Sequence, residues 1–454
     1  MQQIFARAAF TPEGWQNDVV VTIDESGRIA SVAPSARPSG AIQVPVLLPA
    51  LANLHSHTFQ RAMAGLAERR SQAGRDSFWT WREVMYRFLD LLSPEDVETI
   101  AAFAFMEMQE AGFSAVAEFH YLHHQPGGTP YDDQAELSSR ITAAAGKTGI
   151  GLTLLPVLYR YGGADRRALR GGQLRFGNEV SGFERLVARA EAHMAGLPAD
   201  AVLGTAAHSI RAAGMDDIHA ALAIKQSGPF HMHIAEQEPE VQEVLAAYGS
   251  RPVEYLLGEV TVDRRWCLIH ATHMNALETE RLAHSGAVAG LCPVTEANLG
   301  DGFFNGPAFR QAGGTIGIGS DSNIRISVAE ELRQLEYSQR LHHRARALMA
   351  EEGGSCGRAL YEAALAGGAQ ALGRENGALQ AGRWADLVAI DPAAFAGAGE
   401  GDAILDGWIF AGGNDAVTDL WSAGRHMVRE GRHVAREAIA ARYRAVVARL
   451  AGAL

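Results

Sequence analysis

Two histidines separated by one residue, His55 and His57 in the segment LHSH, are the first side chains whose spacing suggests metal chemistry. On a β-strand, alternate side chains point the same way, so both imidazoles could face one ion. Two polar residues at a strand end would give the same pattern, and that plainer interpretation is favoured for an isolated pair. The interpretation as a metal site therefore needs support from elsewhere in the chain.

Two later motifs give that support. The segment HIAE supplies His233, and Glu236 three residues later suits a carboxylate that lies beside a metal and carries protons without binding it. His231 shares the strand parity of His233 but would lie one residue pair deeper. The segment GIGSDSN supplies Asp321, whose burial after an apolar strand costs free energy unless it binds a cation or a partner. Alone, Asp321 could equally cap the next helix.

Eight short apolar runs that end in polar residues, separated by helical stretches, could position these side chains. The runs are LLPALANLHSH, FSAVAEFHY, IGLTLLPVLY, AVLGTAAHS, PFHMHIAE, RWCLIHATH, AVAGLCPVTEAN and TIGIGSDSN. Strands that alternate with helices imply a parallel sheet, and eight such units predict a (β/α)8 TIM barrel. The barrel would gather the ends of the first, fifth and eighth strands on one face, which an open doubly wound sheet would not do.

The two ends of the chain show a different pattern, with β-hairpin signals such as an ESG turn between two apolar runs. We therefore predict a composite β-sandwich domain from residues 1–48 and 384–434, around a barrel of residues 49–383. The segment GRWADLVAIDP is expected to be a strand pair within this composite domain. Residues 435–454 are predicted to form an amphipathic C-terminal helix that packs on the barrel or on a partner.

The bulk composition excludes several classes of function. The 454 residues carry a net charge of −12, which disfavours binding to nucleic acid or to a membrane surface. Three widely spaced cysteines do not form a disulfide framework, so we expect a reducing compartment. With no signal peptide and no long apolar run, the sequence predicts a cytoplasmic protein.

The segments LHSH, HIAE, LIH and GIGSDSN, in this order and spacing, resemble the amidohydrolase superfamily. The resemblance covers almost the whole chain and implies that one divalent metal is bound by four ligands: His55, His57, His233 and Asp321. It also implies that His270 lies beside the metal-bound water. Binuclear members use a carboxylated lysine after the fourth strand, where VLGTAAHSIR has none, so a mononuclear site is predicted. Zinc suits the mixed nitrogen and oxygen ligands, and iron stays open.

This site predicts hydrolytic deamination of a C=N or amidine group. Asp321 would accept a proton from the water that the metal acidifies. Glu236 would transfer a proton to the leaving nitrogen, and His270 would stabilise the tetrahedral centre by hydrogen bonding.

The long segment after the first strand, with candidate contacts in Gln60 and Arg82, is expected to shape substrate specificity. Arg211 follows the fourth strand closely, and two arginines in one pocket would suit a dicarboxylate. A lone arginine is more often a solvated surface residue. Cys292 lies near the pocket by strand position, but a small buried apolar residue is its expected role.

At a finer level, NLHSHTFQRAMAGL, FWTWREVMY, EFHYLHH, HSIRA, HIAEQ and CPVTEANLGDG resemble the branch of the superfamily that acts on N-formimino-L-glutamate. The last segment replaces the CP-x-SN pattern of purine and triazine members. The resemblance implies hydrolysis to N-formyl-L-glutamate and ammonia in histidine degradation, and it suggests a homodimer. It also implies that Arg82 and Arg211 bind carboxylates, and that three other residues contact the substrate: Gln60, Tyr121 and His208.

Two other interpretations stay open. An aromatic-base or nucleoside deaminase would use the same metal ligands with a stacking pocket, for which Trp79 and Trp81 could serve. The two arginines and the missing CP-x-SN pattern argue against it. A non-catalytic assembly protein with this fold would have lost metal ligands, and all the expected ones are present.

Overall fold

Parallel strands pair in chain order from β5 to β13 and form the predicted eight-strand barrel. A bridge between Ser56 and Asp321 brings the last strand back to the first, so the barrel is nearly closed. The fourth strand consists of two short pieces, β8 and β9, that both pair with β7. The strands of the barrel are β5 (Leu51–Ser56), β6 (Phe113–His120), β7 (Gly151–Leu158), β8 (Val202–Leu203), β9 (Thr205–Ala207), β10 (Phe230–Ile234), β11 (Trp266–His270), β12 (Val288–Leu291) and β13 (Thr315–Ile318).

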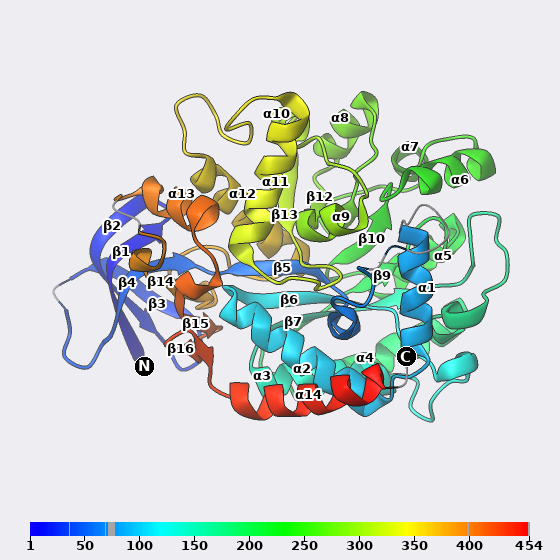
Figure 1. Cartoon of the computed structure of the whole chain (residues 1–454), viewed down its shortest axis with the longest axis horizontal. Coiled ribbons are helices and arrows are strands. Elements are labelled where there is room, and N and C mark those ends of the chain that lie inside the picture. The colour runs from blue at the N-terminus through cyan, green and yellow to red at the C-terminus, as the bar shows by residue number, and fades with distance from the viewer. Residues whose placement is uncertain (36, 69, 71–77, 397–398, 453–454) are drawn as a thin grey trace.

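The structure is a computed structural model and describes residues 1–454 apart from 36, 69, 71–77, 397–398 and 453–454. Helices surround the barrel strands (Figure 1). Their bounds are α1 (Phe78–Leu89), α2 (Pro94–Glu110), α3 (Glu136–Thr148), α4 (Val180–Met194), α5 (Met215–Ile224), α6 (Glu238–Tyr248), α7 (Pro252–Glu259), α8 (Ala276–Ser285), α9 (Pro293–Leu299), α10 (Gly306–Gln311), α11 (Val328–His343) and α12 (Cys356–Leu372).

Local sequence signals explain where several of these helices begin. Ser93 and Asp96 form a capping box at the start of α2: the Ser93 hydroxyl accepts the backbone N–H of Asp96, and the Asp96 carboxylate accepts that of Ser93. The Cys292–Pro293 pair ends strand β12 and begins α9, because proline suits the first turn of a helix. The seventh run was therefore predicted too long, since its last residues, PVTEAN, are helical.

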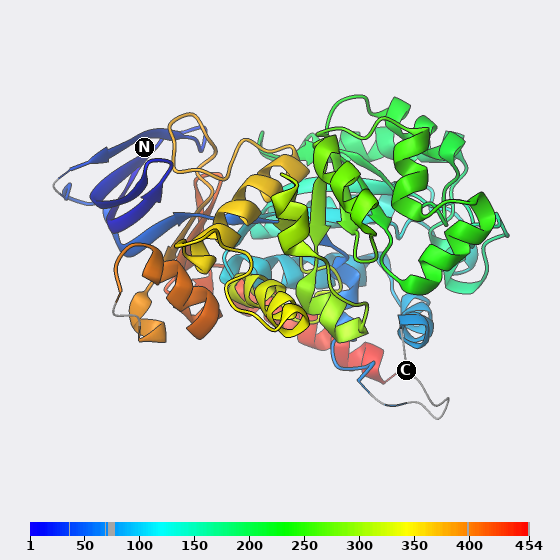
Figure 2. The same ribbon diagram turned by 90° about the horizontal axis from the view of Figure 1, so that it is seen from above.

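Strands from both ends of the chain form a second sheet beside the barrel, as the sequence predicts (Figure 1). Its order is β17-β16-β15-β14-β4-β1-β2-β3, so it is one continuous eight-stranded sheet in which β4 pairs antiparallel with β14. The strands are β1 (Gln2–Thr11), β2 (Gly14–Ile23), β3 (Ile29–Pro34), β4 (Ile42–Pro49), β14 (Leu387–Ile390), β15 (Val417–Ser422), β16 (Arg425–Arg429) and β17 (Arg432–His433). Figure 2 shows this sheet, with its first strands in blue, at one end of the molecule.

The composite sheet has its own apolar core, which includes Ile4, Val21, Leu387 and the fully buried Trp421. The predicted ESG turn joins β2 to β3, and its glycine has a positive φ of 84°. A side chain at Gly27 would place its Cβ 2.2 Å from the carbonyl oxygen of Ala423. The turn therefore requires glycine, both for its positive φ and for the lack of space.

Part of the C-terminal region differs from the prediction. GRWADLVAIDP gives one strand, β14, and not a strand pair, because Asp391 and Pro392 end it: the Asp391 carboxylate accepts the backbone N–H of Ala393 and starts a short 3-10 helix. Between β14 and β15 the chain also forms a helix that the sequence reading did not anticipate, α13 (Asp402–Ala411).

A buried group of charges joins the composite sheet to the barrel. The Arg374 guanidinium, just after α12, forms ion pairs with Asp386 at 2.9 Å and with Asp200 at 2.7 Å. Arg425 of β16 also pairs with Asp200, at 2.7 Å. Asp200 and Arg374 lie in connections of the barrel, whereas Asp386 precedes β14 and Arg425 lies on β16 of the composite sheet. The ion pairs among them therefore join the two parts.

The last helix, α14 (Arg436–Ala451), lies along α2 (Figure 1). The Tyr443 ring stacks on Phe103 of α2 with ring centroids 3.8 Å apart, and Arg449 pairs with Asp96. Across the described part of the chain, none of the helices combines the length and the apolar character that crossing a bilayer would need.

Candidate metal centre and active-site cavity

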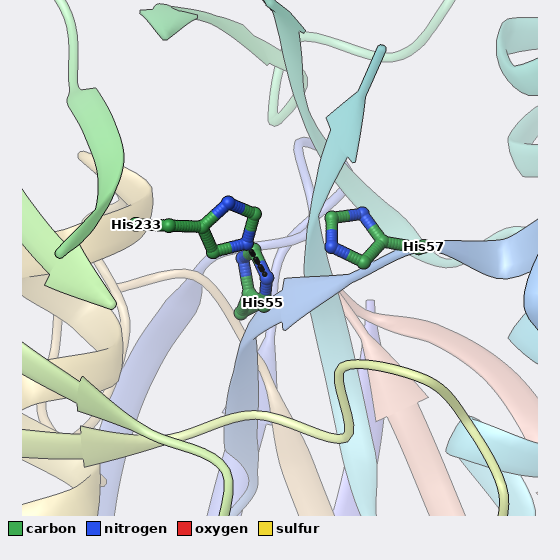
Figure 3. A group of neighbouring side chains, drawn as sticks. All are labelled: His55, His57 and His233. Atoms are coloured by element: carbon green, nitrogen blue, oxygen red, sulfur yellow. Dashed lines mark hydrogen bonds between the residues drawn. The ribbon is translucent and has the colours of Figure 1, made fainter. Parts of the chain in front are cut away.

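Three histidines from two barrel strands meet at the carboxyl end of the barrel. His55 lies on β5, His57 follows it directly, and His233 lies on β10. The Nε2 atoms of His55 and His233 are 3.0 Å apart, and ligand atoms of all three side chains lie within 4.8 Å of one another. Figure 3 shows the three rings converging from the two strands. The structure thus brings together the three predicted imidazole ligands.

The electrostatics of these rings suit a cation. Burial lowers the pKa of His57 to about 3 and lowers the pKa values of His55 and His233 well below their ordinary range, so all three imidazoles are neutral. His57 Nδ1 lies 2.9 Å from the carbonyl oxygen of Phe119 and donates to it, which leaves a lone pair on Nε2. Neutral imidazoles that direct lone pairs at one point fit a divalent metal ion.

Asp321 completes this group from the last strand. Its Oδ1 lies 3.5 Å from His55 Nε2 and 3.4 Å from His57 Nε2. Backbone hydrogen bonds hold it there: the Asp321 N–H donates to the carbonyl of His55, and the His57 N–H donates to the carbonyl of Asp321. The closure of the barrel between its first and last strands therefore positions the carboxylate.

A buried polar network supports this junction. The Asn53 side chain donates to the Ser320 hydroxyl at 2.6 Å, and that hydroxyl donates to Asn323 at 2.6 Å. Asn323 in turn donates to the Ser56 hydroxyl at 3.1 Å. Because each buried group has a partner, the network fixes the two strand ends relative to each other.

His270, the last residue of β11, lies among carboxylates. Its Nε2 is 3.7 Å from Glu236 Oε1 and 3.9 Å from Asp321 Oδ2, while its Nδ1 is 3.3 Å from Glu296 Oε1. Burial lowers the pKa of His270, but these three carboxylates outweigh it and raise that pKa to about 10. The Cys292 thiol also lies near, within 4.8 Å of ligand atoms of His270 and Asp321.

Glu236 is suited to proton transfer. Burial and the neighbouring Glu240 raise the pKa of Glu236 to about 7, against the opposing effect of His270. A carboxyl group with a pKa near 7 can accept or donate a proton at neutral pH. The backbone N–H of Glu236 donates to Glu240 Oε2 at 3.0 Å, which fixes the start of the loop after β10.

A cavity opens over this group and is lined by all five predicted substrate contacts. Gln60, from the 3-10 helix Thr58–Met63, donates from Nε2 to the Tyr121 hydroxyl at 2.8 Å. His208 follows β9, and its Nδ1 is 3.1 Å from the Ser209 hydroxyl. Burial and the nearby Arg211 lower the pKa of His208 well below its ordinary range, so it contributes an uncharged ring.

Two arginines line the same cavity, as the sequence predicts. Arg211 is 6% exposed, and its Nε is 3.7 Å from Glu240 Oε1. Arg82 of α1 lies over the Tyr86 ring, 5.3 Å from its centroid. Trp81 also lines the cavity, while the Trp79 side chain lies outside the described residues.

Several residues around the cavity were missed by sequence reasoning. Tyr159 directly follows the third strand, β7, and lines the cavity, so the strand-end criterion could have found it. Glu240 and Glu296 carry no such signal, because an acid in the first turn of a helix is usually a solvated residue that interacts with the helix dipole. The structure also removes His231 as a competing ligand, because its Nε2 is 2.8 Å from the carbonyl of Ala371.

Comparison with known proteins agrees with this architecture. Residues 46–427 match the Amidohydrolase family, and residues 1–42 match the family described as formimidoylglutamate deiminase HutF, N-terminal domain. The chain is 49% identical to the formimidoylglutamate deiminase of Pseudomonas aeruginosa over 95% of each chain. It is 27% identical to a 5-methylthioadenosine/S-adenosylhomocysteine deaminase of Halobacterium salinarum, over 85% of this chain and 82% of that one.

Solved structures show the same fold. The crystal structure of an amidohydrolase from Brucella melitensis matches with a TM-score of 0.95 at 46% identity, and covers 99% of this chain and 100% of that one. An adenosine deaminase from Xanthomonas campestris with bound zinc matches with a TM-score of 0.83 at 21% identity, over 99% and 98% of the two chains. This second likeness concerns the fold alone.

Proposed function

Because the chain belongs to the amidohydrolase family, we propose that it is a metal-dependent deiminase that converts N-formimino-L-glutamate and water to N-formyl-L-glutamate and ammonia. One observation carries the proposal: Arg82 and Arg211 line the same cavity as the histidine cluster. The close relationship to a formimidoylglutamate deiminase along nearly the whole chain supports the same substrate.

The metal would be held by His55, His57, His233 and Asp321, whose neutral imidazoles and buried carboxylate suit zinc. When bound there, a divalent cation supplies a water molecule acidic enough to act as a nucleophile near neutral pH.

The remaining chemistry falls to side chains of this chain. Glu236, with its pKa near 7, would take up a proton and deliver it to the imino nitrogen, which leaves as ammonia. Asp321 would orient the attacking water and accept its proton. His270 would direct Nε2 at the oxygen of the tetrahedral centre and stabilise the negative charge that develops on it.

Arg82 and Arg211 would bind the two carboxylates of the glutamate part, because a guanidinium pairs bidentately with a carboxylate. Gln60, Tyr121 and His208 are uncharged and would contact the chain between the carboxylates and the formimino group. Dicarboxylate binding by a protein of net charge −12 needs such local positive charge.

The direct test is ammonia release from N-formimino-L-glutamate by the zinc-loaded protein. We expect Arg211→Ala to lower kcat/KM by at least about 100-fold, as the loss of a buried ion pair with substrate implies, while metal content stays unchanged. Arg189→Ala, at an exposed arginine paired with Asp133, is the matched control and should leave kcat/KM within about two-fold.

A second substrate class is tested in the same assay. Trp81, Tyr121 and Tyr159 give the cavity aromatic walls, as an aromatic-base or nucleoside deaminase would require. Release of ammonia from guanine or an adenosine derivative, with none from N-formimino-L-glutamate, would reject the proposal. An inactive protein that binds no metal would favour a non-catalytic role.

Three further expectations accompany this function. We propose a place in histidine degradation and a cytoplasmic location, for which the three free, buried cysteines suit a reducing compartment. A homodimer also stays a prediction, testable by light scattering.

A further inference from the structure

The segment CPVTEAN places a buried carboxylate directly behind His270. Glu296, on α9, is 5% exposed, and its Oε1 lies 3.3 Å from His270 Nδ1. The same oxygen accepts the backbone N–H of Cys292 at 3.0 Å. This segment departs from the CP-x-SN pattern, and the proposed reaction assigns no role to its carboxylate.

The positions around the imidazole define its orientation. Nδ1 and Nε2 lie on different sides of the ring, so a carboxylate at Nδ1 turns Nε2 away from α9. Nε2 accordingly lies 3.7 Å from Glu236 Oε1 and 3.9 Å from Asp321 Oδ2, at the cavity. His270 also has a positive φ of 70°, an uncommon backbone conformation for a residue other than glycine. The ring is thus held between a carboxylate behind it and two in front.

We propose that Glu296 is a positioning residue that accepts the Nδ1–H of His270, keeps a proton on that nitrogen and directs Nε2 at the reacting group. A carboxylate that orients a catalytic histidine and stabilises its imidazolium form has this effect in serine proteases. The Cys292 N–H fixes the carboxylate in turn, so the geometry is set before substrate binds. The catalytic part of this role rests on the proposed function, whereas the hydrogen bond itself does not.

A purely structural role for Glu296 is the alternative, because its bond to the Cys292 N–H also supports the start of α9. Glu331 offers a matched control. It is fully buried and accepts the backbone N–H of Val294, at the same end of the same helix, at 3.0 Å. In the described part of the chain, the Glu331 carboxylate makes no hydrogen bond to His270. Replacing it therefore perturbs the helix start without changing the partner of His270 Nδ1.

The test compares Glu296→Gln with Glu331→Gln in the zinc-loaded protein. Glutamine keeps an oxygen acceptor for the Cys292 N–H but removes the negative charge opposite Nδ1. We expect Glu296→Gln to lower kcat by at least about 100-fold with KM within about three-fold and metal content unchanged. Glu331→Gln should keep kcat within about three-fold. Unchanged kcat in Glu296→Gln, or an equal loss in both variants, would overturn the proposal.

A second readout does not depend on turnover. In the NMR spectrum of protein carrying ¹⁵N-labelled histidine, the Nδ1–H proton of His270 should resonate far downfield. The signal is assigned to His270 because it is absent from the His270→Asn variant. Glu296→Gln should shift or abolish this signal, and Glu331→Gln should not. A signal unchanged in Glu296→Gln would refute the hydrogen bond. If the wild-type protein releases no ammonia from N-formimino-L-glutamate, the substrate proposal fails, yet this measurement still decides the role of Glu296.

Discussion

Four residues at the ends of barrel strands have a left-handed backbone conformation without being glycine: Ala235, His270, Ala271 and Asp321, with φ values of 50°, 70°, 48° and 44°. Such conformations cost on the order of 1–3 kcal/mol and persist only where surrounding interactions impose them. Each of these residues belongs to the metal and proton-transfer group or adjoins it. The backbone conformation therefore sets the direction of these side chains. At Asp321, backbone hydrogen bonds with His55 and His57 hold that conformation.

Two nearly isosteric substitutions should separate metal binding from proton transfer. Asp321→Asn removes a charged ligand, so the purified protein should retain less than about a tenth of its zinc after desalting, in line with the cost of losing a charged metal partner. Glu236→Gln should keep its zinc and lose about 10²- to 10⁴-fold in kcat, the usual contribution of a general acid–base group. Metal analysis and ammonia release measure both effects. Loss of zinc from Glu236→Gln would show instead that Glu236 is a ligand.

The sequence could predict the metal-ligand candidates because strand parity and strand-end position together limit where an imidazole or carboxylate can point. His55, His57 and His233 meet as this reasoning requires. Strand position could not predict Glu240 or Glu296, because both lie on helices. Their contacts with Arg211 and His270 depend on how those helices pack against the barrel. Groups that face the cavity leave a pattern in the sequence, whereas groups that support them do not.

At the level of elements, the close approach of α12 to the barrel depends on small residues. A Cβ on Gly367 would lie 2.0 Å from the carbonyl oxygen of Ile316 on β13, and one on Gly368 would lie 3.1 Å from the carbonyl oxygen of Ala52 on β5. The helix can therefore cover the junction between the first and last strands, where the metal group is assembled.

Gly367→Ala should lower the stability of the protein because the backbone of β13 cannot move away easily. We expect about 1–3 kcal/mol of destabilisation, the usual cost of overpacking, measured as a lower midpoint in urea unfolding. Gly258 of α7 provides the control, since a Cβ there meets no atom within 4 Å. Gly258→Ala should leave stability unchanged or raise it by up to about 1 kcal/mol, because alanine favours helix more than glycine does. Equal effects of both substitutions would contradict the close-contact explanation.

The order of strands was predictable at this scale, whereas the irregular elements were not. Alternating apolar runs and helical stretches define the barrel, and each run ends in polar residues. Helix α13 escaped prediction because its segment DAILDGWIFA lies between strands of the composite sheet and is mostly apolar, so periodicity does not distinguish a short helix from a buried strand there.

On the scale of the whole molecule, the pairing of β4 with β14 and the buried Arg374 group bind the two chain ends to each other and to the barrel. Arg374→Met should therefore destabilise the entire chain by about 3–5 kcal/mol, because it leaves the buried carboxylates of Asp386 and Asp200 short of a partner. Thermal unfolding of the metal-loaded protein would measure it.

Glu375→Gln is the control, since Glu375 is exposed and pairs with Arg28 at the surface. It should cost less than about 1 kcal/mol. If Arg374→Met unfolded at the wild-type temperature, the buried charges would contribute nothing to joining the sheet to the barrel.

The pairing of β4 with β14 also has a consequence for synthesis. A ribosome releases Ile42–Pro49 early, but the strand that covers its edge, Leu387–Ile390, emerges only after the whole barrel has been translated. At about 5–20 residues per second this delay is on the order of tens of seconds. Throughout that time the edge of β4 that pairs with β14 stays unpaired, and such an edge can pair with another chain.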